Sequence, residues 1–449
     1  MSDFLLLAHS FKVSKYNDKK VNYFAPLGLL SIASFAEFNG YDTTVIDMTI
    51  RQNSISKIMD WIEKEKPLLV GICAHTENID LVLKSAKYIK TKFPNVKIAV
   101  GGPHASLEPK YCLNSRYVDF VVIKEGESTF VELLEAISSD QRNIKYDDIG
   151  GIMYRVDKTL IKSKVRPPIS DLDLMPLIKR EYLGFGVYNK RIINMYTSRG
   201  CPAKCIYCAA TALSGASYRT RDIDNVYLEI VLINSSVKNE QYEMYMIDDT
   251  FTAMASRVER FTELIKKYNY QFIWRCESRI DVMTQEILKR MAETGCINIQ
   301  YGIESGSQKV LDGIRKNIDL VKAREIIDMT YRSGITICTS FMIGHYCDTN
   351  ETMQETIDMI RELYEKYDRS IEIFLSYNTP FPGTWQYTHR EEIGLRIGVT
   401  ENWQFTLTDP VVETDNFTLE DQRRIYYENY IYTFRNTREG LDILSNKEQ

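Results

Sequence analysis

The segment TSRGCPAKCIYC, residues 197–208, holds three of the chain's nine cysteines: Cys201, Cys205 and Cys208. It follows an apolar run, residues 192–196, that predicts a short buried strand, so the cysteines fall on the loop leaving that strand's carboxyl end. Enzymes built from parallel α/β units place their chemistry there. Three thiolates at this spacing can converge on one soft metal centre. A [4Fe-4S] cluster held by three cysteines keeps one iron free for a substrate or cofactor.

A structural zinc knuckle is the alternative interpretation of these cysteines. Such a site normally takes a fourth Cys or His close by in the sequence. The nearest candidates on either side are His104, Cys112, Cys276 and His345. All are remote along the chain, so the spacing favours an iron–sulfur cluster.

Composition places the chain among ordinary globular proteins and excludes several classes. At 449 residues, with 44% hydrophobic and 26% charged residues, it is long enough for two or three domains. The net charge is -5 without a basic run, so we expect no nucleic-acid partner. No segment approaches the roughly 18 uninterrupted apolar residues of a membrane span, and the first residues lack the features of a signal peptide. We therefore expect a cytoplasmic protein with no membrane partner. The six remaining cysteines are scattered, which fits a reducing compartment.

The N-terminal part, residues 1–140, alternates short apolar runs with helical patterns such as 27–38 and 78–92. This alternation predicts an open parallel sheet covered on both faces, with ligands bound beyond the carboxyl ends of the strands. The predicted strands are 3–8, 42–47, 68–73, 96–101 and 118–123.

Small and polar residues stand at those predicted strand ends. Gly28 opens the first helix, and Thr76 follows the third strand. Gly101 and Gly102 follow the fourth strand, with His104 just beyond. Paired glycines let the backbone pack against a flat or elongated ligand with no side chain between them. A plain tight turn is the equal alternative.

The rest of the chain predicts a connector, a barrel and a cap. Residues 141–190 combine a strand or hairpin with an extended, proline-punctuated run. Residues 191–395 repeat a strand–helix unit six times, which predicts a partial (β/α)6 barrel with its mouth at the strand carboxyl ends. Residues 396–449 are helical in pattern, with 419–436 amphipathic, and predict a cap over the mouth. The predicted barrel strands are 192–197, 243–247, 272–276, 297–303, 336–343 and 371–377.

The spacing C-x3-C-x2-C, with Tyr207 before the last cysteine, resembles the signature of the radical S-adenosylmethionine (SAM) superfamily. The glycine loops of residues 1–140, with Gly-Glu-Ser-Thr at 126–129, look like the cobalamin (B12)-binding domain that precedes the barrel in one subgroup. The resemblance spans roughly residues 20 to 390. It implies an α/β protein with an N-terminal Rossmann-like (flavodoxin-like) cobalamin-binding domain, then a partial (β/α)6 radical SAM barrel with a helical C-terminal cap.

The resemblance implies a SAM site at the barrel mouth. Asp248 and Asp249 stand where the superfamily binds the amino group of SAM, although acidic turns after strands are common. Arg279 is expected to pair with the SAM carboxylate, or with a neighbouring acid as plain structure.

Two further motifs extend this predicted site. Glu304 and Ser305, in Gly-x-Glu-Ser-Gly, are expected to hydrogen-bond the ribose or methionyl group, while an N-cap is the alternative for Ser305. Lys316 follows at a family-like distance. Gly344 would let adenine lie against the backbone. Family members usually continue with Leu-Pro-Gly-Glu, whereas residues 345–348 read His-Tyr-Cys-Asp, so we expect substrate contacts there.

In related folds the Gly-Gly loop contacts the cobalamin nucleotide tail, which assigns Gly28, Thr76, Gly101, Gly102 and His104 to cobalamin. The Asp-x-His-x-x-Gly motif of cobalt-ligating proteins is absent, because His9 has neither partner in register. That absence fits the subgroup and fits equally a domain that has lost cobalamin. The histidines after the strands either face a corrin edge or cap strands.

The resemblance implies an enzyme that takes an electron from a flavodoxin-like donor and cleaves SAM reductively to a 5′-deoxyadenosyl radical. It further implies cobalamin-dependent methylation of an unactivated carbon in a small-molecule or peptide substrate. Cyclisation, ring contraction or another oxidation, with or without cobalamin, is the alternative. A non-catalytic iron–sulfur carrier or SAM sensor would not need the ordered mouth motifs. A tRNA-modifying sulfur transferase normally brings a second cysteine trio and a basic tail, and neither is present.

Overall fold

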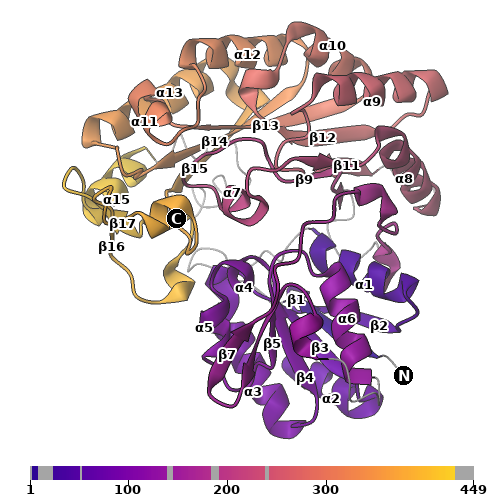
Figure 1. The fold of residues 1–449 in the computed structure, drawn as a ribbon. Coiled ribbons are helices and arrows are strands. Elements are labelled where there is room, and N and C mark those ends of the chain that lie inside the picture. The colour runs from indigo at the N-terminus through magenta and orange to yellow at the C-terminus, as the bar shows by residue number, and fades with distance from the viewer. Residues whose placement is uncertain are drawn as a thin grey trace, which may run out of the picture. The chain divides into compact units, whose positions relative to one another are not determined.

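The computed structural model describes residues 3–8, 24–50, 53–138, 145–183, 192–237 and 242–429. It divides into two compact units, residues 1–192 and 193–449, and each is treated by itself (Figure 1). His9 and the end of the predicted 419–436 helix, from residue 430, lie outside the described residues. No helix within the described segments is long and apolar enough to cross a membrane.

A seven-stranded sheet forms the centre of the first unit, in the order β2-β1-β3-β4-β5-β6-β7. The first five strands are parallel and follow the flavodoxin-like order. In that order the direction in which successive strands are added to the sheet changes between β1 and β3. β6 and β7 add antiparallel strands at one edge. The strands are β1 Phe4–Ala8, β2 Thr43–Asp47, β3 Leu69–Cys73, β4 Lys97–Gly101, β5 Phe120–Val122, β6 Ile152–Val156 and β7 Thr159–Lys162.

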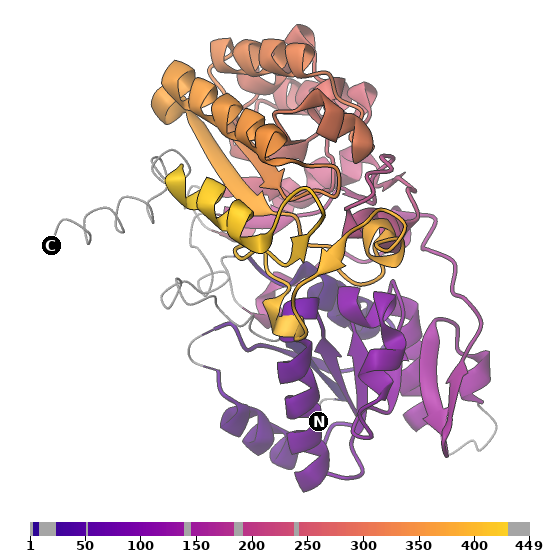
Figure 2. The ribbon, with the colours of Figure 1, turned by 90° about the vertical axis from the view of Figure 1, so that its left-hand side faces the viewer.

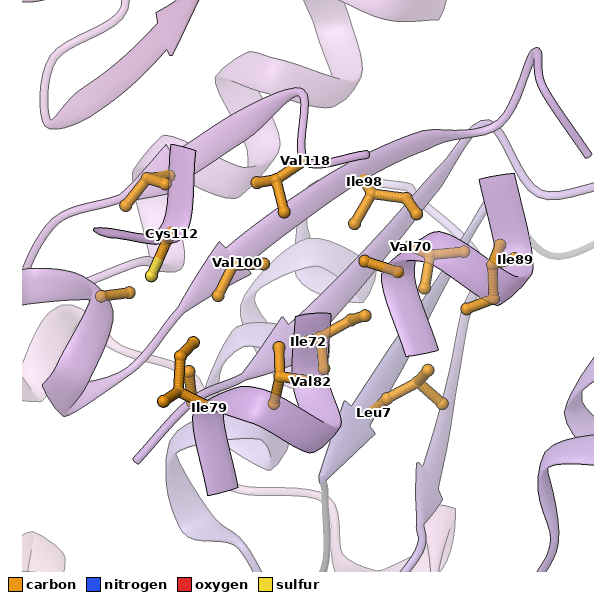
Figure 3. Close-up of a cluster of buried hydrophobic side chains, with 14 of the residues drawn as sticks. Leu7, Val70, Ile72, Ile79, Val82, Ile89, Ile98, Val100, Cys112 and Val118 are labelled. Atoms are coloured by element: carbon orange, nitrogen blue, oxygen red, sulfur yellow. The ribbon is translucent and has the colours of Figure 1, made fainter. Parts of the chain in front are cut away.

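Helices cover both faces of this sheet, as the strands' continuous apolar runs require. On one face, α2, α3 and α5 pack on Leu7, Val70 and Ile98 in a closed apolar core (Figure 3). On the other face, Phe130 of α6 lies where a side chain at Gly71 would stand. The helices are α1 Leu27–Phe38, α2 Ile55–Glu65, α3 Ile79–Lys92, α4 Pro103–Leu107, α5 Pro109–Leu113 and α6 Glu127–Ser138.

The second unit contains a six-stranded sheet in the order β15-β14-β13-β12-β11-β8, so sequence neighbours are spatial neighbours. The pairs from β11 to β15 are parallel, which brings their carboxyl ends to one edge. The strands are β8 Ile192–Met195, β11 Glu243–Met246, β12 Ile273–Ser278, β13 Cys296–Glu304, β14 Thr336–Ile343 and β15 Ile371–Tyr377. Two small ribbons are β9 Ser198–Arg199 with β10 Arg219–Thr220, and β16 Arg396–Ile397 with β17 Val412–Glu413.

The long helices of this unit line one face of the sheet (Figure 1). α15 runs beside α13 (Figure 2). There Arg361 donates a hydrogen bond to Asn429 Oδ1 at 2.9 Å. The helices are α7 Ala209–Ser214, α8 Ile223–Ser236, α9 Ala255–Tyr268, α10 Gln285–Glu293, α11 Gln308–Gly313, α12 Leu320–Arg332, α13 Asn350–Tyr367, α14 Trp385–Thr388 and α15 Leu419–Glu428.

The predicted α/β architecture is confirmed, and most predicted strands differ from the observed ones by one or two residues. The predicted connector is less independent than expected, because its hairpin, β6 and β7, continues the first sheet. By pairing with β5, β6 forms backbone hydrogen bonds along its length. In a free hairpin those backbone groups would be exposed to solvent.

Candidate active site

The cysteine loop, residues 200–208, leaves the sheet through a close backbone approach at Gly200. This glycine has φ +87°, and a Cβ there would lie 2.1 Å from the carbonyl oxygen of Ser217. The residue before it, Arg199, ends β9 and pairs with Arg219 of β10. Only glycine allows this turn without strain, so residue 200 fixes where the three cysteines begin.

The three loop thiols form the donor set of the candidate cluster. All are free, with Cys205 buried and Cys201 and Cys208 half-buried. Burial raises the pKa of Cys201 and of Cys208, and proximity to Cys205 adds to both increases. Within the described segments, no three His, Cys, Asp or Glu side chains converge tightly enough to hold a metal ion. The donor chemistry, three neighbouring thiols on one loop, fits a [4Fe-4S] cluster with one open iron.

Backbone hydrogen bonds hold this loop at Ile206. Its N–H donates to the carbonyl of Ile314 at 3.2 Å, and its carbonyl accepts from the N–H of Gln386 at 3.1 Å. Ile314 follows α11, and Gln386 lies in α14. The loops after β13 and β15 therefore grip the cysteine loop from two sides.

The two predicted acids after β11 have different surroundings. Asp248 is 1% exposed, and its carboxylate accepts the N–H groups of Thr197 and Ser198 at 2.6 and 2.9 Å. Asp249 is exposed at the cysteine loop, where the N–H of Gly200 bonds to its carboxylate. The Asp249 carboxylate has fewer backbone hydrogen bonds than that of Asp248 among the described residues. Asp249 is therefore the better placed of the two to receive an ammonium group.

Arg279 lies close to the cysteine loop, and the neighbouring acid is part of its setting. Its guanidinium forks onto Asp281 at 2.9 and 2.7 Å and donates to the carbonyl of Lys316 at 3.2 Å. The same positive charge acts on Cys201, whose pKa it lowers against the larger effect of burial. The structural alternative is thus present, and the SAM-carboxylate role of Arg279 stays a prediction.

Glu304 occupies an unusual backbone conformation at the end of β13. Its φ is +77°, a region that costs a non-glycine residue about 1–2 kcal/mol and that is frequent at functional sites. Its carboxylate pairs with Lys316 Nζ at 3.0 Å, and both side chains are 9% exposed. Lys316 Nζ also donates to the Tyr207 hydroxyl at 3.4 Å. A charged pair therefore stands directly against the cysteine loop.

Ser305 is used by its own loop. Its hydroxyl accepts the N–H of Ser307 at 3.1 Å and shares a hydrogen bond with Thr356 at 3.2 Å. Ser307, not Ser305, occupies the N-cap position of α11. The structure thus gives Ser305 a loop-stabilising contact, and its role toward SAM stays a prediction.

The turn after β14 is packed against other parts of the protein. A Cβ on Gly344, φ +87°, would lie 2.1 Å from Oε1 of Gln422 on α15. Asp348 accepts the N–H groups of Gly344 and His345 at 3.0 and 2.8 Å. His345 is fully buried, and neither ring nitrogen has a hydrogen-bond partner in the part of the chain that the structure describes. The substrate contacts expected at residues 345–348 stay a prediction, as does the adenine role of Gly344.

In the first unit, the glycine positions fit a ligand laid against the backbone. Gly28 is exposed, and a Cβ there would meet no atom of the described residues within 4 Å. Gly102, φ +97°, would bring a Cβ within 2.9 Å of the carbonyl oxygen of Ala74, so this turn demands glycine. Gly101 ends β4, where only Val122 lies near its Cβ position. Gly102 thus makes a tight turn that requires glycine, and its contact with cobalamin stays a prediction, while Gly28 offers an open backbone surface.

His104 and Thr76 lie together at the same strand ends. His104 Nδ1 and the Thr76 hydroxyl are 3.1 Å apart, and His104 Nε2 is buried with no hydrogen-bond partner among the described residues. Burial lowers the pKa of His104 to about 4, and His75 nearby lowers it further, so the ring is neutral at neutral pH. An orphaned nitrogen at this edge fits a polar group of a bound cofactor.

Several contacts lay beyond reasoning from the sequence. The contact of Gln422 with Gly344 joins positions far apart in the chain, with no motif at either end to signal it. The Lys316–Tyr207 hydrogen bond spans 109 positions. Lys316 follows the Gly-x-Glu-Ser-Gly motif at a family-like distance, and that distance was the available signal.

Comparison with known proteins finds one family model in the N-terminal part of the chain and another in the part that holds the cysteine loop. The family model described as B12 binding domain matches residues 15–134, and that of the Radical SAM superfamily matches residues 195–360. An uncharacterized methyltransferase of Pyrococcus horikoshii is 30% identical over 417 residues, covering 90% of this chain and 87% of the relative. The chain belongs to the radical SAM enzymes that carry a B12-binding domain. The cofactors of this radical SAM enzyme are a [4Fe-4S] cluster, SAM and cobalamin.

Two further proteins are similar to this B12-binding radical SAM enzyme, one in sequence and one in solved structure. An anaerobic magnesium-protoporphyrin IX monomethyl ester cyclase of Rubrivivax gelatinosus is 24% identical over 400 residues, 87% of this chain and 70% of the relative. The solved structure of the radical SAM methyltransferase TsrM from Kitasatospora setae, with cobalamin and a [4Fe-4S] cluster bound, has a TM-score of 0.70. It is 17% identical and covers 91% of this chain and 83% of that chain, so it shares the fold.

Proposed function

We propose that this enzyme is a C-methyltransferase that uses cobalamin to methylate an unactivated carbon of a small-molecule or peptide natural-product substrate. The observation that carries the proposal is the 30% identity, across both domains, to a relative named as a methyltransferase. When bound, the cluster and SAM supply the radical chemistry, and cobalamin supplies a methyl carrier. The substrate is proposed by class alone, and a flavodoxin-like protein is the proposed electron donor.

The chain's own residues hold and orient SAM in this proposal. Cys201, Cys205 and Cys208 hold the cluster. Asp249, exposed beside the cysteine loop, receives the methionine ammonium, since a carboxylate is the natural partner of that cation. Arg279, placed close to the cysteine loop, receives the methionine carboxylate. Asp248 contributes indirectly, because its buried carboxylate fixes the backbone from which the loop starts.

The remaining predicted contacts complete two cofactor sites. Glu304, Ser305 and Gly344 contribute to SAM from the ends of β13 and β14. In the first unit, the open backbone at Gly28 and the orphaned Nε2 of His104 support a cobalamin site. Thr76, Gly101 and Gly102 complete that cobalamin site at the same sheet edge.

The decisive experiment follows SAM products of the protein loaded with iron, sulfide and cobalamin under anaerobic, reducing conditions. Methyl transfer uses one SAM as methyl donor and a second as radical source. We therefore expect S-adenosylhomocysteine and 5′-deoxyadenosine in about equal amounts once the substrate is supplied. Cys201→Ala, Cys205→Ala and Cys208→Ala should each abolish 5′-deoxyadenosine formation. Persistence of that product in the cysteine variants would contradict the assignment of the cluster ligands.

Cyclisation is the second candidate, favoured by the similarity to a protoporphyrin ester cyclase over 87% of this chain. A cyclase would release 5′-deoxyadenosine without a matching quantity of S-adenosylhomocysteine. The ratio of the two products therefore separates the candidates.

A further inference from the structure

The cysteine loop has an exposed side that none of the cofactor assignments above uses. Lys204 is exposed there, whereas Cys205 and Ile206, which follow it, are buried. Among the described residues, the Lys204 ammonium forms no ion pair with a carboxylate. An unpaired positive charge therefore stands next to one of the cluster cysteines in the sequence.

Arg315 brings a second positive charge to the same loop. It follows Ile314, whose carbonyl accepts the Ile206 N–H at 3.2 Å. Its side chain is exposed and, within the described segments, likewise lacks a carboxylate partner. Lys316, the next residue, differs because it is buried and paired with Glu304 at 3.0 Å. Arg315 therefore presents its charge to solvent, while the charge of its neighbour is neutralised inside the protein.

An aromatic pair holds the Arg315 guanidinium beside the loop. The guanidinium carbon lies 5.0 Å from the centre of the Trp385 ring, and that ring stacks on His389 with centroids 4.3 Å apart. Trp385 precedes Gln386, whose N–H donates to the Ile206 carbonyl at 3.1 Å. A guanidinium over an indole is held in place while its N–H groups stay available, and Arg and Trp are both enriched in protein interfaces.

We refer to Lys204, Arg315, Trp385 and His389 as the basic–aromatic face. We propose that this face is the docking surface for an acidic, flavin-carrying protein that delivers one electron to the cluster. The electron leaves the flavin hydroquinone of the partner, which becomes a semiquinone, and passes to the cluster behind the loop. Opposite charges steer such encounters and raise the association rate. Redox interfaces are also small, often below about 1,200 Å², so a few side chains can define one.

This inference rests on the cluster and the electron donor of the proposed function and names where the donor binds. It also predicts the sign of a nearby charge. Asp312 is exposed on α11, and its carbonyl accepts the N–H of Arg315 at 3.1 Å. Its carboxylate opposes an acidic partner, so removing that charge should favour docking.

The test measures reduction of the cluster in the full-length protein loaded with cluster and cobalamin and mixed without oxygen with the hydroquinone of a bacterial flavodoxin. Rapid-freeze electron paramagnetic resonance counts the reduced clusters with time. We expect Arg315→Glu and Lys204→Glu each to slow the second-order rate about tenfold at low ionic strength. The difference should shrink in about 0.5 M salt, which screens exposed charges. Asp312→Asn should raise the rate about twofold.

Photoreduced deazaflavin serves as a small reductant that needs no protein docking surface, and it should reduce all variants at the wild-type rate. Iron analysis of every sample verifies equal loading. The matched control is Lys322→Glu, a charge reversal at an exposed position of α12, which should leave the flavodoxin rate unchanged.

An unchanged flavodoxin rate in either Arg315→Glu or Lys204→Glu, or equal slowing in Lys322→Glu, would overturn the docking proposal. Slower reduction of the two variants by deazaflavin as well would overturn it too, because the substitutions would then act on the cluster itself. Failure of deazaflavin to reduce the wild-type protein would count instead against the cluster of the proposed function.

Discussion

His345 is a buried imidazole in a position where the resemblance expects leucine. Within the described segments neither of its nitrogens has a hydrogen-bond partner, and solvent does not reach the ring. Burial lowers its pKa to about 3, and the charge of Lys316 lowers it further, so the ring is neutral at ordinary pH. An unpartnered polar group in a packed interior opposes folding, because it loses its hydrogen bonds to water without replacement.

His345→Leu is therefore expected to stabilise the second unit by about 1–2 kcal/mol, since leucine has similar volume and no polar atoms. Urea unfolding monitored by far-ultraviolet circular dichroism measures the change. His389→Leu is the control, because the His389 ring is bonded to Thr388 and Trp385 and stacks on the indole. An equal gain in the control, or a loss of stability in His345→Leu, would contradict this account.

Asp348 gives the same turn a dependence on pH. Burial raises the pKa of its carboxyl to about 6, above an ordinary value near 4. The native state thus holds the proton more tightly than the unfolded state, so this contribution to stability is present below about pH 4 and is lost as pH rises through about 6. Two pKa units correspond to about 3 kcal/mol.

Asp348→Asn should remove that loss. Its amide oxygen still accepts from the backbone of Gly344 and His345, and its amide group can donate to the Thr352 hydroxyl, which now donates to Asp348 at 2.7 Å. Between pH 4 and pH 7, we expect the free energy of unfolding of the variant to rise relative to wild type by about 3 kcal/mol. Parallel pH profiles for the two proteins would rule the interpretation out.

At the scale of elements, periodicity in the sequence determined most of what could be foreseen. β14 and β15 begin and end where the apolar runs 336–343 and 371–377 predicted, because buried parallel strands read as continuous apolar segments. The hairpin of β6 and β7 was recognisable locally, but its pairing with β5 depends on a contact that no local pattern encodes. The contact of Gln422 on α15 with Gly344 likewise depends on a long-range contact that no local pattern encodes.

Two glycines at the ligand edge of the first sheet allow an element-scale test. Gly102→Ala places a methyl group against Ala74 in a backbone region that favours glycine, so we expect a loss of about 2 kcal/mol in stability. Gly28→Ala adds a methyl group within α1 that meets none of the described residues, so we expect a gain of about 0.5 kcal/mol.

Cobalamin binding should separate these variants further. If the cofactor lies against the backbone at Gly28, the added methyl group lowers cobalamin affinity about tenfold in a protein that is no less stable. Absorbance titration with hydroxocobalamin measures the affinity, and thermal unfolding measures the stability. Undiminished affinity in Gly28→Ala would exclude close approach of cobalamin at that residue.

For the whole molecule, the sequence identified which cofactors belong to which part, because cysteine spacing and glycine loops are local signals. It could not separate Asp248 from Asp249, since the two differ only in what the folded chain places around them. Asp248 is enclosed by Thr197 and Ser198, whereas Asp249 stays exposed. Surroundings of this kind come from chain segments about 50 positions apart, which no single motif describes.

Ligand binding should therefore stabilise the two units selectively. At a hundredfold excess over its dissociation constant, cobalamin is expected to add about 2.7 kcal/mol to the unfolding free energy of the unit that binds it. Hydrogen exchange by mass spectrometry should show the slowing in peptides that cover 26–30, 74–78 and 101–106. Slowing centred on the cysteine loop instead would place cobalamin in the other unit.

The two backbone hydrogen bonds of Ile206 bear on whether the enzyme can regain its cluster after exposure to oxygen. Oxygen destroys exposed clusters, yet the peptide hydrogen bonds to Ile314 and Gln386 do not involve iron or sulfur. We therefore expect a molecule that has lost its cluster by oxidation to keep its cysteine loop in place through these bonds and, once its thiols are reduced again, to take up a new cluster in the folded state. Aerobic purification followed by reloading in a glove box thus becomes a practical route to active material, with no denaturation step between.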